Sequence, residues 1–189
     1  MEITNLELQN QIKSITTQIN TIDTNIKSLT SDVNLWKTTR GSRMYLWANA
    51  YKKILLRDNY VLVDVPLSAS VQFNGSSYFA KSGNYIKILK KCEVNIFAAI
   101  DFCRVDGGNT GSDYCFDLLR GSTQLSESVI NVADNSGYHH TTVFCPALQC
   151  NANDLIKFQA MARVGGSLEV FGDTQKVRTF LCVELLSTL

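Results

Sequence analysis

The sequence has no excess of either charge, since 18 Lys and Arg residues stand against 17 Asp and Glu among 189 residues. It also has no Arg-rich segment or basic stripe, so binding to nucleic acid is not expected. No apolar run reaches membrane-spanning length, and the N-terminus lacks the basic start and apolar core of a secretory signal. We therefore expect no membrane insertion. A protein of this kind that acts outside a bacterium would leave by lysis or within a particle.

Motifs for catalysis and for cofactor binding are also missing. The sequence shows no Ser-His-Asp or Cys-His arrangement and no phosphate-binding loop, so we expect neither an enzyme nor a cofactor. One alternative stays open, because Asp101, Asp106 and Asp113 are close in sequence and could act as the paired carboxylates of a glycosidase. Aspartates in loops more commonly form solvated turns.

Six cysteines allow a disulfide framework, but most of them lie in apolar runs and no export signal precedes them. We predict that they are reduced and that most pack in the core, because a free cysteine behaves as a small hydrophobic residue. Cys145 and Cys150, with His139 and His140 upstream, do not match the spacing of a zinc finger or ribbon, so no metal is predicted. The cysteines are Cys92, Cys103, Cys115, Cys145, Cys150 and Cys182.

The N-terminal stretch carries apolar residues in alternating steps of four and three, which is the heptad period of a coiled coil. Isoleucine occupies both core positions of the heptad, which favours three or four strands over two. We predict a trimeric stalk over residues 1–37. The alternative is a single amphipathic helix on its own domain, although such a helix usually has a wider apolar face. The predicted trimerisation residues are Leu8, Ile12, Ile15, Ile19, Ile22, Ile26, Leu29, Val33 and Trp36.

The heptads stop at a polar segment that contains Gly41, and we expect a neck or linker over residues 38–59. Within it, the residues from 43 to 58 suit either an amphipathic helix or short buried strands, with a preference for strands. From residue 60 to 189 the pattern is β throughout, with turn-forming residues between apolar runs. Strands are predicted at 60–65, 71–73, 85–89, 94–102, 114–119, 128–132, 141–145, 154–163, 167–171 and 179–186. This spacing, without a helical pattern, predicts a β-sandwich or jelly roll.

Four segments carry a resemblance to a known superfamily. They are residues 78–96, with a tyrosine, a small loop, a glycine and two strands, then 118–122, 153–158 and the closing strand 179–185. These segments resemble the trimeric jelly-roll superfamily of tumour necrosis factor and of the globular head of the complement first component. The resemblance covers about residues 61–186 and is one of pattern. Cys92 and Asn153 stand where that family usually has glycine.

The combination of a short coiled coil with a small trimeric β head is similar to phage fibre and receptor-binding proteins. No collagen-like tract precedes the head. The resemblance implies a mainly β homotrimer on the virion surface, made in the host cytoplasm and attached to the particle through its N-terminal end. It also implies a head that binds a host-surface ligand, such as a glycan. The alternative is a structural or decorating fibre without a strong ligand.

Recognition in a jelly roll is expected from the loops, because loops tolerate variation and point outward. The candidate loops are 106–113, 132–140 and 164–175. Their side chains offer hydrogen-bonding groups and aromatic faces that could hold a sugar. For any one residue the alternative is an ordinary solvated turn. The candidate ligand-binding residues are Asp106, Asn109, Asp113, Tyr138, His139, His140 and Phe171.

Overall fold

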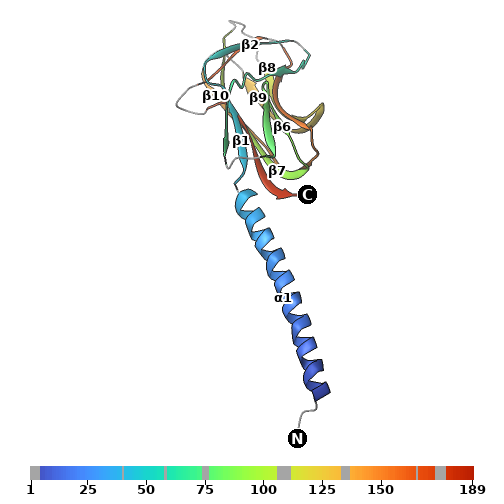
Figure 1. Ribbon diagram of the computed structural model, residues 1–189. Helices are drawn as coiled ribbons and strands as arrows, with labels where there is room; N and C mark the ends of the chain where they lie inside the picture. The colour runs from blue at the N-terminus through green and yellow to red at the C-terminus, as the bar shows by residue number, and fades with distance from the viewer. Residues whose placement is uncertain are drawn as a thin grey trace. The chain divides into compact units, whose positions relative to one another are not determined.

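The computed structural model describes residues 5–39, 41–57, 59–73, 77–105, 112–132, 137–164, 166–172 and 178–189. The chain divides into two compact units, Met1–Thr39 and Arg40–Leu189. The first unit contains a single helix and the second is a β-sandwich (Figure 1). Among the described residues, no helix combines the length and the apolar content that a membrane span requires.

The helix α1 (Asn5–Thr39) contains neither glycine nor proline, and the predicted helix is confirmed. Several threonines on it donate their hydroxyl groups to the carbonyl oxygen four residues earlier; Thr16 Oγ1 lies 2.8 Å from the oxygen of Ile12. Lys27 Nζ lies 2.7 Å from Asp23 Oδ2, one turn away. These contacts satisfy polar groups within the helix and leave its apolar side chains for other contacts.

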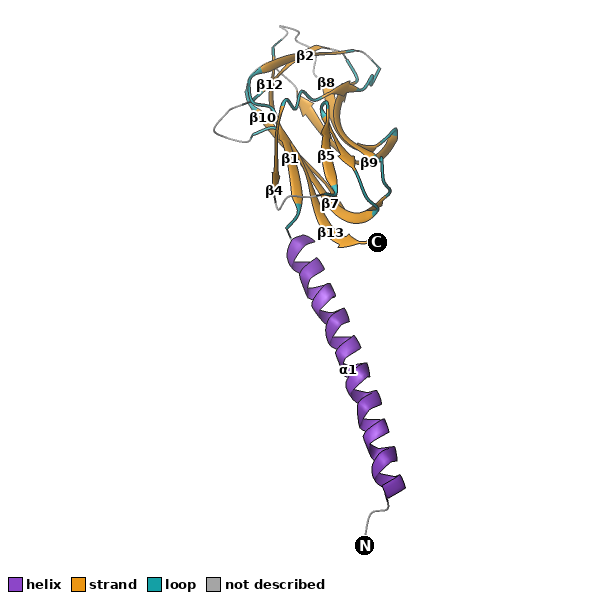
Figure 2. Ribbon diagram, in the orientation of Figure 1, coloured by secondary structure: helices purple, strands orange, loops and turns teal. Residues whose placement is uncertain are grey.

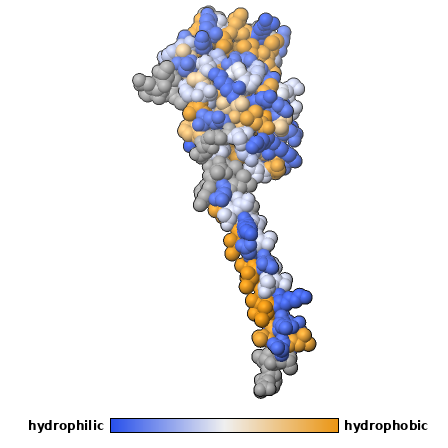
Figure 3. All heavy atoms as spheres, in the orientation of Figure 1, coloured by the Kyte–Doolittle hydropathy of each residue, from blue (hydrophilic) through white to orange (hydrophobic). Residues whose placement is uncertain are grey.

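The apolar side chains of α1 form a narrow stripe along one side (Figure 3). From Leu8 to Val33 the predicted core positions of the heptads are 47% to 63% exposed in the single chain. In the described part of this unit, no other element covers them. The side chain of Trp36 lies outside the described part. A helix that exposes so regular a stripe gains most of its stability when a partner covers the stripe.

The first sheet of the sandwich has the order β2-β12-β7-β13-β1-β4, and β10 pairs with the remaining edge of β7. All of its neighbouring strands are antiparallel. Its strands are β2 (Lys52–Leu56), β12 (Gly166–Val170), β7 (Cys92–Arg104), β13 (Phe180–Thr188), β1 (Arg43–Trp47), β4 (Ala69–Phe73) and β10 (His139–Cys150).

The second sheet has the order β5-β6-β11-β8-β9, and β3 pairs with β11. The labels β5, β8 and β9 mark strands of this sheet in Figure 2. These pairs are antiparallel as well. Its strands are β5 (Phe79–Ser82), β6 (Tyr85–Ile88), β11 (Leu155–Ala162), β8 (Ser112–Arg120), β9 (Thr123–Val132) and β3 (Val63–Asp64).

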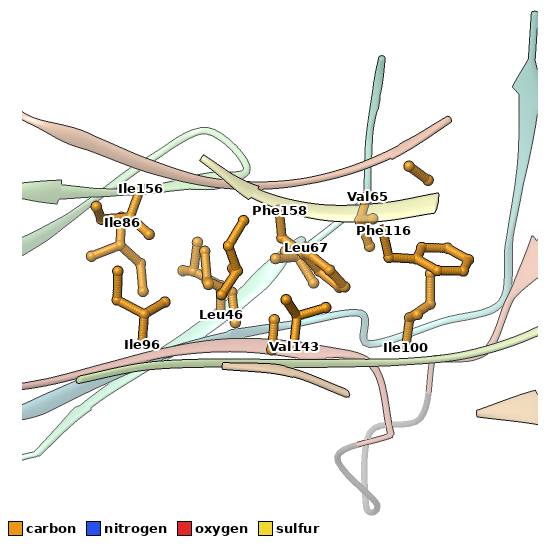
Figure 4. Packing of buried hydrophobic residues seen from close by; sticks show 14 of the residues in the cluster. Leu46, Val65, Leu67, Ile86, Ile96, Ile100, Phe116, Val143, Ile156 and Phe158 are labelled. Atoms are coloured by element: carbon orange, nitrogen blue, oxygen red, sulfur yellow. The ribbon is translucent and has the colours of Figure 1, made fainter. Parts of the chain in front are cut away.

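The core lies between the two sheets, and the alternation of side chains along the strands creates most of it. Along β11, every second residue is buried, as a strand with one face toward a core requires. Phe102 of the first sheet packs 4.9 Å from Phe116 of the second, and Phe116 lies 6.5 Å from Phe158, between ring centres. Aliphatic side chains from both sheets fill the remaining space (Figure 4). This interior fixes which face of each strand points outward.

Most of the predicted strands are present, although their ends differ. The predicted neck over 38–59 needs correction: β1 lies between β13 and β4, and β2 pairs with β12, so both strands belong to the first sheet. The predicted strand over 60–65 shortens to the two residues of β3. Asn59 and Tyr60 adopt φ angles of 62° and 57°, which turn the chain before the strand. Sequence periodicity over so short a stretch does not detect such a turn.

The long strand β10 contains a bulge where the chain reads Cys145-Pro146-Ala147. The register against β7 shifts between Cys145 and Leu148. Proline cannot donate to the ladder, and Ala147 takes a φ of 48°, so its backbone N–H donates instead to Asn95 Oδ1 at 3.1 Å. The bulge shifts which residues of β10 face outward. Before the bulge the register is regular, and Phe144 and His140 lie on the outer face of the sheet.

All six cysteines are free thiols in this structure. Four of them, Cys92, Cys115, Cys150 and Cys182, are buried. Cys92 and Cys150 lie opposite each other on β7 and β10, and burial raises the pKa of Cys150 to about 12. A thiol with so high a pKa is not ionised at neutral pH and reacts slowly.

A buried carboxylate on the second sheet makes the stability of the head depend on pH. Asp117 is 2% exposed, and burial, followed by the charge of Glu127 on the adjacent strand, raises its pKa to about 6. Gln124 Nε2 donates to Asp117 Oδ1 at 3.2 Å and acts in the opposite direction. Because the folded pKa lies above the unfolded value, ionised Asp117 destabilises the fold above pH 6, and protonation relieves this as the pH falls toward 4.

We therefore predict that Asp117→Asn stabilises the protein at neutral pH. The amide keeps an oxygen that can accept from Gln124 but carries no charge, so the free energy of unfolding at pH 7 should rise by about 1–3 kcal/mol. At pH 4 the gain should largely disappear, because wild-type Asp117 is then protonated. Urea unfolding at both pH values measures this difference. An equal gain at pH 4 and pH 7 contradicts the assignment to charge.

Candidate functional site

The outer face of the first sheet carries a row of apolar side chains, one from each of five adjacent strands. Their positions follow from the strand register, which places each residue directly opposite the next. Residues opposite each other in antiparallel strands point to the same face. This aromatic row consists of Val71 on β4, Tyr45 on β1, Cys182 on β13, Phe97 on β7 and Phe144 on β10.

Two rings of the aromatic row stack on each other, and Tyr45 contacts the ring of Phe73 on β4. Phe97 stacks on Phe144 with 4.6 Å between ring centres, and these two side chains are 37% and 45% exposed. At the other end, Tyr45 meets Phe73 edge to face at 5.9 Å. Val71 is 38% exposed. Cys182, between them, is only 3% exposed, so the row is exposed at its two ends, and exposed apolar side chains gathered on one sheet face are typical of an interaction surface.

Arg43 adds a polar group to one end of this face. Its guanidinium carbon lies 4.9 Å from the ring centre of Phe73, and the side chain helps to line a shallow pocket of about 230 Å³ with Tyr45, Trp47 and Val71. Its Nε atom is buried and has no hydrogen-bond partner among the described residues. A buried donor without an acceptor costs free energy, which the contact of the guanidinium group with the Phe73 ring partly offsets.

A second aromatic group, here called the aromatic corner, consists of Tyr51, Phe171 and Tyr138. Tyr51 directly precedes β2, Phe171 directly follows β12, and Tyr138 directly precedes β10. The ring of Phe171 lies 5.0 Å from that of Tyr51 at 90° and 4.8 Å from that of Tyr138 at 49°. Phe171 is only 3% exposed, whereas Tyr51 and Tyr138 are 55% and 77% exposed. A buried ring therefore supports two exposed ones.

A carboxylate and an imidazole lie beside this corner. Asp101 on β7 and His140 on β10 are directly opposite each other, and Asp101 Oδ1 contacts His140 Nδ1. The backbone N–H of Phe171 donates to the oxygen of Asp101 at 2.9 Å, which extends the pairing of β12 with β7 by one residue. Thr179 Oγ1 accepts from the backbone N–H of Asp101 at 3.1 Å. Phe171, Asp101 and His140 thus share the outer face of the first sheet.

The corner depends on a close backbone approach at Gly172. A Cβ atom at this position would lie 2.2 Å from the backbone oxygen of Ala50 and 2.5 Å from its nitrogen. Only glycine allows residues 50 and 172 to come this close. Because Tyr51 and Phe171 are the next residues on each segment, this contact brings their rings together.

The structure brings together three of the predicted ligand-binding residues, Tyr138, His140 and Phe171. His139 lies in the same segment but points to the other face of β10, where its ring packs 5.3 Å from Phe102 of the core. Consecutive residues of a strand alternate in direction, so the two histidines cannot both reach one surface site. Asp106 and Asn109 lie outside the described residues.

Asp113 lies on β8 in the second sheet, away from the strands that carry the aromatic corner. Asn131 Nδ2 donates to its Oδ1 at 2.7 Å, and Arg163 Nε lies 3.4 Å from its Oδ2. These contacts connect β8 to its neighbours and use both carboxylate oxygens. Asp101 lies on the first sheet, so the two aspartates belong to different sheets.

Two residues of this region, Tyr51 in the corner and Asp101 beside it, were not predicted as ligand-binding. Tyr51 precedes Phe171 by 120 positions in the sequence, and only the pairing of β2 with β12 makes them neighbours. Asp101 was considered only as a glycosidase carboxylate. The sequence could have indicated its position, because Phe97 and Asp101 are four residues apart on one strand and therefore point to the same face. In the part of the chain that the structure describes, no group of three or more His, Cys, Asp or Glu residues is arranged to hold a metal.

Comparison with known proteins supports the fold. No family model and no curated protein matches the chain. Among solved structures, murine APRIL at pH 5.0 is similar with a TM-score of 0.51 and 10% identity, over 78% of this chain and 100% of that chain. Eiger TNF from S. frugiperda gives 0.49 and 8%, over 79% and 96%. The similarity to APRIL shows that the head has a TNF-like jelly-roll fold. At this level of identity it extends to the fold alone.

We predict that Gly172→Ala destabilises the head and disturbs the corner. The added Cβ overlaps backbone atoms of Ala50, which cannot rotate away, so we expect a loss of about 1–3 kcal/mol in the free energy of unfolding. Near-ultraviolet circular dichroism should report the displaced tyrosine rings. Gly83→Ala is the comparison, because Gly83 has a φ of 62° but open space around it, so its cost arises from the backbone alone. Unchanged stability and spectrum for Gly172→Ala contradict the close packing.

Proposed function

We propose that the chain is the subunit of a homotrimeric fibre on a virion surface and that its β head attaches the particle to a host. The helix of each copy would enter a three-stranded coiled coil, and the aromatic row of each head would lie against a neighbouring head. The N-terminal end would attach to the particle. The observation that carries this proposal is the exposed apolar surface that each of the two units presents.

The helix supports this proposal because its heptad positions are roughly half exposed in the single chain. Removing that remaining area from water contributes about 1 kcal/mol per side chain. Isoleucine at both heptad core positions favours a trimer over a dimer. The polar residues beside the seam do not carry the opposite charges that select a different partner, which suits identical chains.

The surface of the head supports the proposed trimer independently of the helix. The aromatic row spans five strands, its members Val71, Phe97 and Phe144 are 37% to 45% exposed in the single chain, and the guanidinium group of Arg43 lies at the same face. An apolar face with an arginine beside it fits a protein surface that supplies apolar contacts, since aromatic residues and arginine are enriched in protein interfaces. A second copy of the same head is the occupant that agrees with the trimer predicted from the helix.

Binding, rather than catalysis, is proposed for the remaining exposed site. The aromatic corner presents rings and one hydrogen-bonded carboxylate–imidazole pair, which are groups suited to recognition. Three such sites on one trimer would raise a weak affinity through avidity. The alternative is a decorating fibre without a strong ligand, in which the trimer forms but does not attach to cells.

Two pairs of substitutions test the assembly. Ile19→Asp with Ile22→Asp introduces charge into the seam, and Phe97→Asp with Phe144→Asp introduces it into the aromatic row. Each pair should lower the mass measured by light scattering, because burying an unpaired carboxylate costs several kcal/mol. All four side chains are exposed in the single chain, so the fold of each unit should survive.

Control variants place added carboxylates on other surfaces. Thr17→Asp with Thr24→Asp puts two carboxylates on the polar side of the helix, and Val129→Asp puts one on β9 of the second sheet, where Val129 is 57% exposed. These controls should keep the wild-type mass. If the seam and row variants also keep it, the proposed interfaces are wrong.

Attachment is tested with labelled full-length protein on host cells. The wild type should bind, and the seam and row variants should bind at least tenfold more weakly because they lose avidity. Trimers that bind no cells would support the decorating fibre instead. Equal binding by trimeric and dissociated variants would contradict attachment through repeated weak sites.

A further inference from the structure

We propose that the aromatic corner and the Asp101–His140 pair form a subsite for one pyranose ring of a carbohydrate. This inference rests on the proposed attachment function and names the chemical class of its ligand. The sugar would place its apolar face against the exposed tyrosine rings and its hydroxyl groups against the carboxylate and the imidazole.

The stacking surface is exposed yet firmly supported. Tyr138 and Tyr51 present most of their rings to solvent, while the buried ring of Phe171 contacts both of them. Phe171 is fixed by the hydrogen bond from its own backbone N–H to Asp101 and by the close approach of Gly172 to Ala50. Rigid aromatic rings give large contact area at a small entropic cost, which favours stacking of a ligand with an apolar face.

The polar groups suit hydroxyl groups in particular. Asp101 uses Oδ1 toward His140, and its Oδ2 atom would accept a hydrogen bond from a sugar hydroxyl. The Nε2 atom of His140 would donate to or accept from a second hydroxyl. His140 and Asp101 are 59% and 24% exposed, so a ligand can reach both side chains. Vicinal hydroxyl groups on a pyranose ring offer a donor and an acceptor at this short spacing.

The site differs in chemistry from the aromatic row. The row carries no charged side chain, whereas the corner lies beside the ionisable pair Asp101–His140. Along β7, Asp101 lies four residues beyond Phe97, which corresponds to about 13 Å. Another copy of the chain is the competing occupant of the corner, and the masses of the corner variants distinguish the two occupants.

The test uses saturation-transfer NMR on full-length protein with five probes. They are the methyl pyranosides of glucose, galactose, mannose, N-acetylglucosamine and N-acetylgalactosamine. We expect transfer to ring protons of one face of at least one sugar. Tyr138→Ala, Tyr51→Ala and Asp101→Asn should each weaken its binding at least fivefold. Tyr138→Phe, which keeps the ring, and Val129→Ala, on the other sheet, should bind as the wild type does.

Each outcome decides the inference. Lack of transfer from all five sugars, or equal binding by the wild type and Tyr138→Ala, overturns it. A change of mass in Tyr138→Ala also overturns it, because the corner would then be a contact between copies. Protein that binds cells but none of the sugars refutes the pyranose subsite and leaves the attachment function standing. Protein that binds neither contradicts both.

Discussion

Removal of apolar surface from water is the constraint on which this structure depends. Within the head the two sheets satisfy it for one chain, because alternate residues of each strand face a shared core. Two surfaces remain after the chain has folded, namely the heptad stripe of α1 and the aromatic row of the first sheet. A single copy has no further element in its described parts with which to cover them. The proposed trimer removes both surfaces from water with identical partners.

The strand β7 connects this assembly to the candidate site. Its outward residues place Phe97 in the aromatic row and, four residues later, Asp101 beside the aromatic corner. On the neighbouring β10, Phe144 and His140 follow the same spacing before the bulge. The strands thus hold the aromatic row and the aromatic corner at a fixed separation, and the proposed trimer would present the corner three times.

The helix and the sandwich could be predicted from the sequence because each has a periodic pattern of apolar residues that few residues interrupt. The heptad of α1 and the alternation of β11 are visible along the chain itself. Features that arise from contacts between distant segments could not be predicted in this way. Strands β1 and β2 looked like a neck because only pairing with β13, β4 and β12 makes them part of a sheet. Tyr51 and Phe171 meet for the same reason. The two adjacent histidines were predicted together, although alternation places them on opposite faces.

The central claim is that three identical chains cover each other's apolar surfaces. Sedimentation equilibrium of the wild-type protein over a hundredfold range of concentration tests it most directly, because it measures mass without assuming a shape. A single species of about three times the chain mass of 21.1 kDa across that range is the result that we expect. A species with the mass of one or two chains would contradict the account.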